Sequence, residues 1–483
     1  MRRLSRVEYD DTVFDLLLDD SRPARVGLPE DIVDPFDNDF TLQESSSVLV
    51  SGLESLANDV ANRLAADPVR RAALVPCAKP ANCMGPFVRQ FGRRALRRPL
   101  EVDEVNTYQQ LAEAFSGNDG WDGVDVVVRM LLQHPEFVYR VEVGSPTEKA
   151  GVFRLNDYEV ATRLSYFLWG TTPDDRLLDL AESGLLSDPS LVRKAASEMM
   201  SDPRAEDRVD RFHAMWLGYW QLPHDAELTL AMREETRRLL DEVLFAEPGS
   251  WLELFTMNGT WIGDDLAAHY DLPPPGSATP EFVSYGSTTR QGILSHGSFL
   301  SVAGKFGDTS PTQRGILIRT RLLCQPIPPP PPEVNADEPP SGTPADCKED
   351  RYAMHRESGT CRDCHEVMDP VGFGLENYDQ EGRFRTTDLN KPDCVISGDG
   401  HIDDVEFNGP KELANVLVDD PNLTACVVSQ AFHFAMGHEA QYADRPVVEG
   451  LTEGFIASGY RFDRLILDIV SDPTFLYRLE ESP

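Results

Sequence analysis

Hydrophobic residues recur at helical spacing through most of the first 280 positions. Residues 156–170 show this most clearly, because Asn156 and Glu159 form a capping-box pattern and the following apolar positions share one helical face: Val160, Leu164, Phe167 and Leu168. Gly170 stands where a helix is expected to stop. Similar spacing predicts helices over 174–186, 190–200 and 206–220, each soon followed by a proline. The pattern indicates a helical bundle.

The pattern changes beyond residue 286. The proline run at 324–334 predicts an extended polyproline segment, and residues 335–346 have the composition of a linker or strap. Residues 394–409 predict a short β-hairpin. Helical spacing then returns over three further segments, 411–418, 423–435 and 446–458. We therefore expect a mainly α-helical, multi-module protein with a small β-hairpin near the C-terminus.

One internal repeat is visible. Residues 131–142 match residues 469–480, sharing Pro, Phe, Tyr, Arg and Glu at the same offsets. Cysteines extend the match, because Cys83 and Cys426 each precede a phenylalanine by eight residues. The match predicts a duplicated helical unit, since a helix pair that cannot bury its own face is stabilised by packing against a copy. The alternative is chance similarity between two turns that lead into helices.

Charge and hydropathy bear on which partners and which cellular location are expected. The 483 residues hold 45 Lys and Arg against 81 Asp and Glu, a net charge of −36 that disfavours nucleic acid as a partner. No apolar run approaches the ~20 residues that a membrane-spanning helix needs. The basic N-terminus continues as an amphipathic, acid-containing helix and lacks the apolar core of a secretion signal.

Cys361, Cys364 and His365 form a CxxCH motif, the pattern of covalent c-type haem attachment. Two thiols one helical turn apart can each add to a vinyl group on one porphyrin edge, and the adjacent imidazole then lies under the iron. Three alternatives stay open. A zinc site would need two more ligands, and His355 is the near candidate. A redox disulfide would be expected after a strand, and residues 356–360 do not predict a strand. The motif can also be a degenerate one that no longer binds haem.

Residues 361–385 resemble the cytochrome c-like module of the planctomycete-type cytochrome c multi-module family. The resemblance extends along the chain in matching order, through residues 2–9, 91–99, 164–170, 292–298 and 310–315. It implies five modules, the other four of unknown function: 1–66, helical; 67–147, helical with an Arg-rich motif; 148–285, a helical bundle; 286–390, cytochrome c-like with the strap and CxxCH; and 391–483, a hairpin plus a helical repeat of 67–147.

The resemblance further implies one covalent haem c and an exported protein of the periplasm or cell surface. Family members begin with an export signal, whereas this chain begins inside its first helical module. We expect either that the start is misplaced or that the chain is a processed or partnered fragment, in which case a partner chain supplies the missing N-terminal region.

Further ligands follow less directly. His355 resembles a histidine that the family places before its CxxCH, and Met436 has a suitable separation, so both are candidates for the second axial ligand beside His365. Arg383 and Arg385 are candidates to bind the haem propionates. The denser cluster of Arg89, Arg93, Arg94, Arg97 and Arg98 is expected mainly to pair with nearby acids.

The other six cysteines allow three disulfides in an oxidising compartment: Cys77 with Cys83, Cys324 with Cys347 and Cys394 with Cys426 are one set of pairs. The whole pattern predicts a c-type haem protein that transfers electrons to an unidentified redox partner or acts as a haem oxidoreductase of unassigned substrate. The alternative is a cell-surface binding or structural protein whose CxxCH module is vestigial or holds a non-haem metal.

Overall fold

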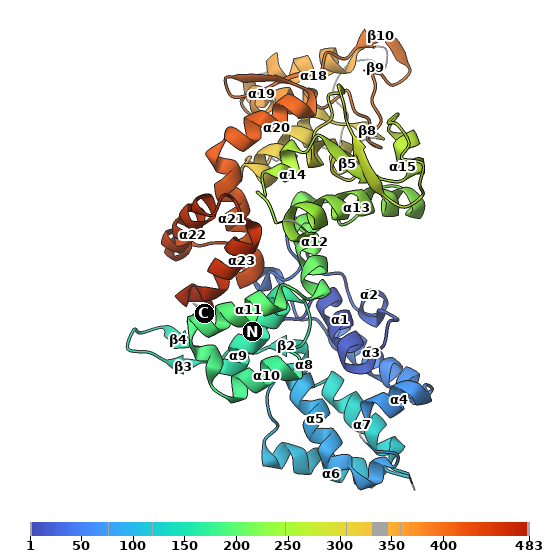
Figure 1. Cartoon of the computed structure of the whole chain (residues 1–483), viewed down its shortest axis with the longest axis vertical. Helices are drawn as coiled ribbons and strands as arrows, with labels where there is room; N and C mark the ends of the chain where they lie inside the picture. The colour runs from blue at the N-terminus through green and yellow to red at the C-terminus, as the bar shows by residue number, and fades with distance from the viewer. Residues whose placement is uncertain are drawn as a thin grey trace. The chain divides into compact units, whose positions relative to one another are not determined.

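The structure is a computed structural model that describes residues 2–75, 77–117, 119–246, 248–305, 307–330, 346–357 and 359–480, excluding the side chains of 354, 355, 357 and 360 (Figure 1). The described residues are mainly α-helical with small two- or three-stranded sheets, which confirms the predicted fold class. Two compact units are present. The first combines Met1–Val209, Phe432–Val447 and Ile466–Pro483; the second combines Asp210–Ala431 and Val448–Leu465. Each unit thus draws on several of the expected modules, whose boundaries stay a prediction.

The first unit is built from helices around one apolar core. Entirely within it lie α1 (Arg6–Leu17), α2 (Pro23–Gly27), α3 (Ser47–Ala65), α4 (Pro68–Leu74), α5 (Met84–Leu96), α6 (Val102–Phe115), α7 (Trp121–Leu132), α8 (Pro135–Val138), α9 (Asp157–Leu168), α10 (Asp175–Glu182) and α11 (Pro189–Met199). Val13, Val60, Phe87 and Val128 from α1, α3, α5 and α7 are almost completely buried together. Burial of these apolar faces stabilises helices that would be marginal alone.

Small antiparallel sheets join distant parts of this unit. Strand β1 (Arg2–Arg3) pairs with β2 (Tyr139–Arg140), and β4 (Val152–Arg154) lies between β3 (Ser145–Pro146) and β13 (Tyr477–Leu479). Four helices contribute residues to both units: α12 (Pro203–Leu217), α21 (Pro421–Met436), α22 (Arg445–Ala457) and α23 (Phe462–Ser471).

The second unit carries the CxxCH motif. Its own helices are α13 (Ala226–Asp241), α14 (Glu253–Thr256), α15 (Asp264–His269), α16 (Gly297–Ser301), α17 (Pro311–Leu317), α18 (Lys348–Glu357), α19 (Gly359–Phe373) and α20 (Gly409–Asp419). Its strands form four antiparallel pairs: β5 (Gly259–Ile262) with β6 (Glu281–Ser284), β7 (Gly304–Lys305) with β8 (Asp308–Thr309), β9 (Thr387–Asp388) with β10 (Lys391–Val395), and β11 (Asp399–Ile402) with β12 (Val405–Asn408).

The helix and hairpin predictions are confirmed. Helix α9 begins after Asn156, whose side chain accepts from the Glu159 amide in a complete capping box. Gly170 follows the helix at a φ of +70°, a conformation that glycine adopts without strain. The predicted hairpin is formed by β11 and β12. Cys394 lies outside it, in the preceding strand β10, which pairs with β9. Of the predicted proline strap and linker, residues 331–345 lie outside the described residues.

The two copies of the repeat have the same local structure. A helix, a short helical turn and a strand follow one another as α7, α8 and β2 in one copy, and as α23, Pro473–Leu476 and β13 in the other. Phe137 and Phe475, at the same offset, are both fully buried. The matched cysteines differ, because Cys83 and Cys426 bond to partners at unrelated positions. A common origin of the two segments stays a prediction.

Three disulfides are formed, and two of the expected pairings are wrong. Cys77–Cys83 is confirmed, but Cys324 bonds Cys426 across 102 residues, and Cys347 bonds Cys394 across 47. The expectation paired cysteines without knowledge of their positions in space. Folding brings α21 beside Cys324, which follows the π-helical segment Ile318–Leu322, and brings the start of α18 beside β10. The Cα separations of 5.3 and 5.4 Å therefore permit these bonds instead.

No helix among the described residues is both long enough and apolar enough to cross a membrane.

Candidate functional site

Helix α19 presents the CxxCH motif in its first two turns. Cys361 and Cys364 lie one turn apart, which places their side chains on the same helical face, and His365 follows directly. Both thiols are partly exposed and unbonded, while the six other cysteines form disulfides. The other six cysteines are bonded to one another, so these two thiols are available for a covalent bond to another group. Covalent attachment of haem needs two thiols for the porphyrin and an imidazole for the iron, and this motif contains all three groups.

The His365 imidazole is held by a carboxylate one turn further along α19. Its Nδ1 atom lies 3.1 and 3.0 Å from the two carboxylate oxygens of Asp369. The Asp369 side chain is fully buried, whereas the His365 side chain is 21% exposed. Thr312 Oγ1 of helix α17 donates a second hydrogen bond of 2.6 Å to the same carboxylate. Asp369 was not predicted as a site residue, although its spacing of four from His365 on a helix could have indicated it.

Two glycines allow α17 to approach α19 so closely. A Cβ atom on Gly372 would lie 1.8 Å from the Pro311 carbonyl oxygen, and one on Gly315 would lie 1.9 Å from the Met368 carbonyl oxygen. Only glycine fits where two backbones are in direct contact. The close crossing brings Thr312 within reach of Asp369, so the position of the carboxylate depends on both helices.

A buried charge cluster anchors the segment before the motif. Lys348, the first residue of α18, contacts Glu376 at 2.9 Å and Asp308 at 2.8 Å, and Arg314 contacts Glu376 at 3.1 Å. Burial raises the pKa of Glu376, but Lys348, Arg314 and Arg385 outweigh it and hold the pKa below its usual value. The same balance, led by Lys348, lowers the pKa of Asp308 to about 2. With the Cys347–Cys394 disulfide, the cluster fixes where α18 begins.

The two predicted propionate ligands occupy different environments. Arg383 is about half exposed and pairs with Asp379 and Glu381, both at 2.9 Å. Arg385 is largely buried and donates to Glu376 at 2.8 Å and to Thr309 at 2.6 Å. A propionate would therefore compete with internal carboxylates at both arginines, and at Arg385 it would compete within the buried cluster. Their role toward haem stays a prediction.

The candidates for the second axial ligand are not brought to His365 by any described contact. The His355 side chain lies outside the described residues. Met436 is buried in the first unit, whereas the CxxCH motif lies in the second. Among the described residues, no three His, Cys, Asp or Glu side chains are grouped to hold a metal ion.

Two arginines of the Arg-rich motif, Arg93 and Arg98, form ion pairs with carboxylates. Arg98 contacts Glu104 at 2.8 Å and Glu136 at 2.7 Å, and Arg93 contacts Asp179 at 2.7 Å. Arg97 is buried and donates to main-chain carbonyls, including that of Tyr139 at 3.1 Å. These arginines therefore stabilise the first unit.

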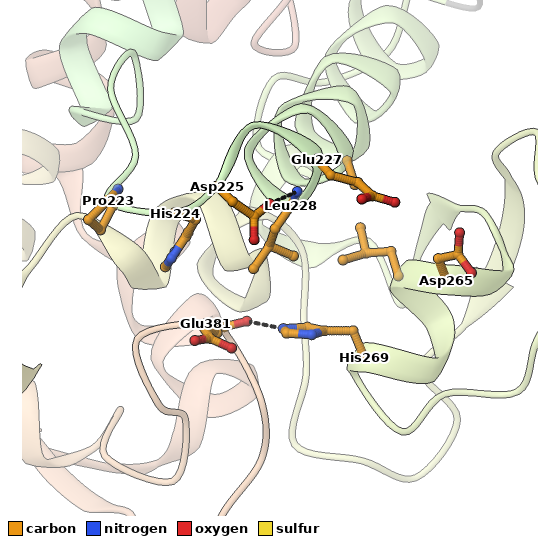
Figure 2. Close-up of a pocket in the computed structure, with 10 residues that line it drawn as sticks. Pro223, His224, Asp225, Glu227, Leu228, Asp265, His269 and Glu381 are labelled. Carbon is orange, nitrogen blue, oxygen red and sulfur yellow. Dashed lines mark hydrogen bonds between the residues drawn. The ribbon is translucent and has the colours of Figure 1, made fainter.

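A cavity of about 540 Å³ opens elsewhere in the second unit, between α13, α15 and the loop that carries Glu381. Figure 2 shows His224, His269 and Glu381 around it, and the carboxylates of Asp225, Glu227 and Asp265 also line it. His269 Nε2 donates to the Glu381 carbonyl at 2.9 Å, and His224 Nε2 lies 2.7 Å from Ser301 Oγ. The His269 hydrogen bond thus joins two of the residues that line the cavity.

Buried polar residues connect α13 with α15 and α16 in the same unit. Glu235 accepts from Thr260 at 2.9 Å and from Tyr270 at 2.8 Å. Burial raises the pKa of Glu235 to about 7 and, together with Arg290, lowers the pKa of His296 to about 3. Ser298 and His296 both bond Thr236, and all three are fully buried, so no exposed nucleophile is formed.

A mainly helical chain with disulfides and a thiol-bearing CxxCH helix defines the class: a helical multi-module protein with a cytochrome c-type module. Five family models match it, each described as a protein of unknown function: DUF1587 over residues 2–66, DUF1595 over 83–142, DUF1592 over 155–272, DUF1588 over 290–388 and DUF1585 over 403–475. The chain belongs to the planctomycete-type cytochrome c multi-module family. No curated protein and no solved structure matches it.

Proposed function

We propose that this chain is a c-type haem protein that transfers electrons, or acts as a haem oxidoreductase, outside the cytoplasm. Cys361 and Cys364 attach the haem covalently, and His365 is the proximal ligand. One observation carries the proposal: in a chain whose six other cysteines form disulfides, the two CxxCH cysteines are unbonded, partly exposed and one turn apart beside a histidine.

The residues around the motif have separable tasks. When bound, haem supplies an iron centre for electron transfer or for chemistry on a small molecule. Cys361 and Cys364 would hold the group through thioether bonds, and the Asp369 hydrogen bond to Nδ1 orients the imidazole and leaves Nε2 as the nitrogen that would bind the iron. The α17 crossing holds the helix that bears all three, and the Lys348 cluster fixes the start of α18, the helix before it.

The disulfides also support a location outside the cytoplasm. Structural disulfides persist in oxidising compartments and are rare in the cytoplasm. The three disulfides therefore fit a protein of the periplasm or cell surface, where covalent haem attachment also takes place in this family.

The test is expression of the full chain, exported together with a cytochrome c maturation system, followed by a reduced pyridine haemochrome spectrum. We expect one covalent haem per chain. Cys361→Ala and Cys364→Ala should each leave at most one thioether bond, and His365→Ala should keep some covalent haem but lose the proximal ligand. Replacing Cys77 and Cys83 with alanine is the matched control and should leave attachment intact.

Two outcomes would overturn the proposal. Intact thiols at Cys361 and Cys364 without covalent haem, under conditions that mature a known c-type cytochrome, would favour the vestigial alternative. An unchanged spectrum in His365→Ala would show that the proximal ligand is another residue.

A further inference from the structure

We propose that Asp369 is a positioning residue of the haem site that lowers the reduction potential of the iron through His365. The inference rests on the proposed function, because it concerns the same imidazole. Its basis is the geometry of α19, where a fully buried carboxylate faces the nitrogen of His365 that does not bind iron.

The contact is well suited to this role. Both Asp369 oxygens lie within 3.1 Å of His365 Nδ1, so the ring N–H donates to a carboxylate rather than to a neutral carbonyl. A hydrogen bond to an ionised acceptor is about twice as strong as one between neutral groups. Because the carboxylate is fully buried, water screens its charge little. The bond therefore gives the imidazole more negative character than a neutral acceptor would.

The carboxylate cannot readily turn away from the ring. Thr312 holds one Asp369 oxygen at 2.6 Å from the opposite helix, and Gly315 and Gly372 keep that helix in backbone contact with α19. The side chain is thus restrained from α17, through the Thr312 hydrogen bond and the close backbone crossing that keeps Thr312 in place. Such restraint is what a residue needs if it is to fix the orientation of a ligand.

The consequence for the iron follows from charge. A more basic proximal ligand stabilises the ferric state more than the ferrous state, so the potential falls. Hydrogen bonding to the axial ligand is one of the few means by which a protein sets a haem potential. We expect a site poised toward the oxidised form, relative to the same chain with a neutral residue at 369.

The chain offers a matched control. Glu366 is next to His365 on α19, is more than half exposed, and pairs with Arg362 at 3.2 Å. Glu366→Gln removes one negative charge near the motif without touching the Nδ1 hydrogen bond. Asp369→Asn removes one negative charge and leaves an amide oxygen as a neutral acceptor. An effect of surface charge near the motif would appear in Glu366→Gln, whereas an effect through the ligand would appear only in Asp369→Asn.

The experiment measures the midpoint potential by spectroelectrochemistry on full-length protein that pyridine haemochrome shows to carry one haem per chain. We expect Asp369→Asn to raise the midpoint potential. At a fixed applied potential the ferrous-to-ferric ratio should increase about tenfold, which corresponds to a rise of about 59 mV for a one-electron couple. Glu366→Gln should shift the midpoint potential much less. Thr312→Val leaves the carboxylate but removes its other donor, so it should not raise the potential.

The results separate this inference from the proposed function. Covalent haem with equal potentials in wild type and Asp369→Asn, or equal shifts in Asp369→Asn and Glu366→Gln, would overturn the role of Asp369 alone. A rise in both Asp369→Asn and Thr312→Val would indicate simple loosening of α19 and would also overturn it. Absence of covalent haem in the wild type would overturn both proposals.

If Asp369→Asn does not fold, the wild-type protein decides the matter through the iron–imidazole stretching frequency of its ferrous form. A frequency above that of a haem with a neutral imidazole ligand supports the inference, and one equal to it overturns the inference.

Discussion

The Lys348 ammonium lies 2.9 Å from the Glu376 carboxylate, and only 4% and 2% of the two side chains is exposed. Removal of Lys348 leaves the buried Glu376 carboxylate with Arg314 and Arg385 as cations, so its charge is compensated less fully. We therefore expect Lys348→Met to lower the free energy of unfolding by about 2–3 kcal/mol, less than the ~3–5 kcal/mol for a buried charge that loses its one partner. Urea denaturation of the full chain measures the loss.

The exposed pair of Arg383 with Asp379 is the control for this variant. Water already solvates its charges, so Arg383→Met should cost less than about 1 kcal/mol. Equal losses in the two variants would contradict the idea that the Lys348 cluster anchors α18.

Gly372 is expected to tolerate no side chain. Its Cβ would lie 1.8 Å from the Pro311 carbonyl oxygen, so Gly372→Ala must separate α17 from α19. Overpacking of this kind costs about 1–3 kcal/mol or more. Thermal denaturation should show a lower midpoint for this variant, and haem attachment provides a second readout.

Gly450, in the middle of α22, provides the opposite case. Nothing lies within 4 Å of the position that its Cβ would take, and the residue is exposed. Alanine restricts the unfolded chain more than glycine does, so Gly450→Ala should raise stability by about 0.4–1 kcal/mol. Destabilisation by both substitutions would contradict the distinction drawn between the two sites.

The Cys324–Cys426 bond should contribute more stability than the Cys77–Cys83 bond. Their sequence separations are 102 and 6, and a longer loop removes more entropy from the unfolded chain. Replacing each pair with alanine should cost about 4–5 and roughly 2 kcal/mol, respectively. Denaturant midpoints test the order, and peptide mapping under non-reducing conditions tests the pairing. A Cys324–Cys347 peptide would show that the pairing in the structure is wrong.

Glu235 should make stability depend on pH. Burial raises its pKa from 4.5 to about 7, so the folded chain keeps a proton that the unfolded chain releases between these values. The associated stability is complete below pH 4.5 and is lost as pH rises through about 7, a change of roughly 3 kcal/mol. The unfolding free energy of the wild type minus that of Glu235→Gln should therefore decrease as pH rises from 4.5 to about 7.

The comparison with Glu235→Gln is needed because His296 acts in the opposite direction. The pKa of His296 is lowered to about 3, so its contribution is lost as pH falls. His296 is present in both proteins, and its effect cancels in the difference. A difference that is constant or increases from pH 4.5 to 7 would contradict the assignment to Glu235.

Binding of carbon monoxide should distinguish a carrier from a catalyst. A carrier fills both axial positions with protein ligands, whereas a haem that acts on small molecules keeps one position open or displaceable. We expect the sixth ligand to be displaceable, with His355 the candidate, so ferrous protein should bind carbon monoxide readily. His355→Ala should keep this binding and change the ferric spectrum, while Met436→Ala should change neither. Slow or absent binding with a low-spin ferric spectrum would favour the electron carrier.

Local sequence determined much of the fold. The capping box at Asn156, the stop at Gly170 and the hairpin before residue 409 were all predictable because each depends on residues within one or two turns of each other. The CxxCH motif was recognisable for the same reason, and the Asp369 contact to His365 also lies within one turn of α19.

Tertiary structure alone decided the rest. The pairing of Cys324 with Cys426, the approach of Thr312 to Asp369 and the burial of Lys348 against Glu376 join residues 102, 57 and 28 positions apart. Such contacts depend on how helices pack, which local periodicity does not specify. Gly315 and Gly372 illustrate this point, because each contacts the backbone of another helix. The sequence around a helical glycine does not reveal whether another helix or solvent lies against it. The sequence by itself determined the helices and the CxxCH motif, while packing decided which carboxylates, thiols and hydroxyls surround them.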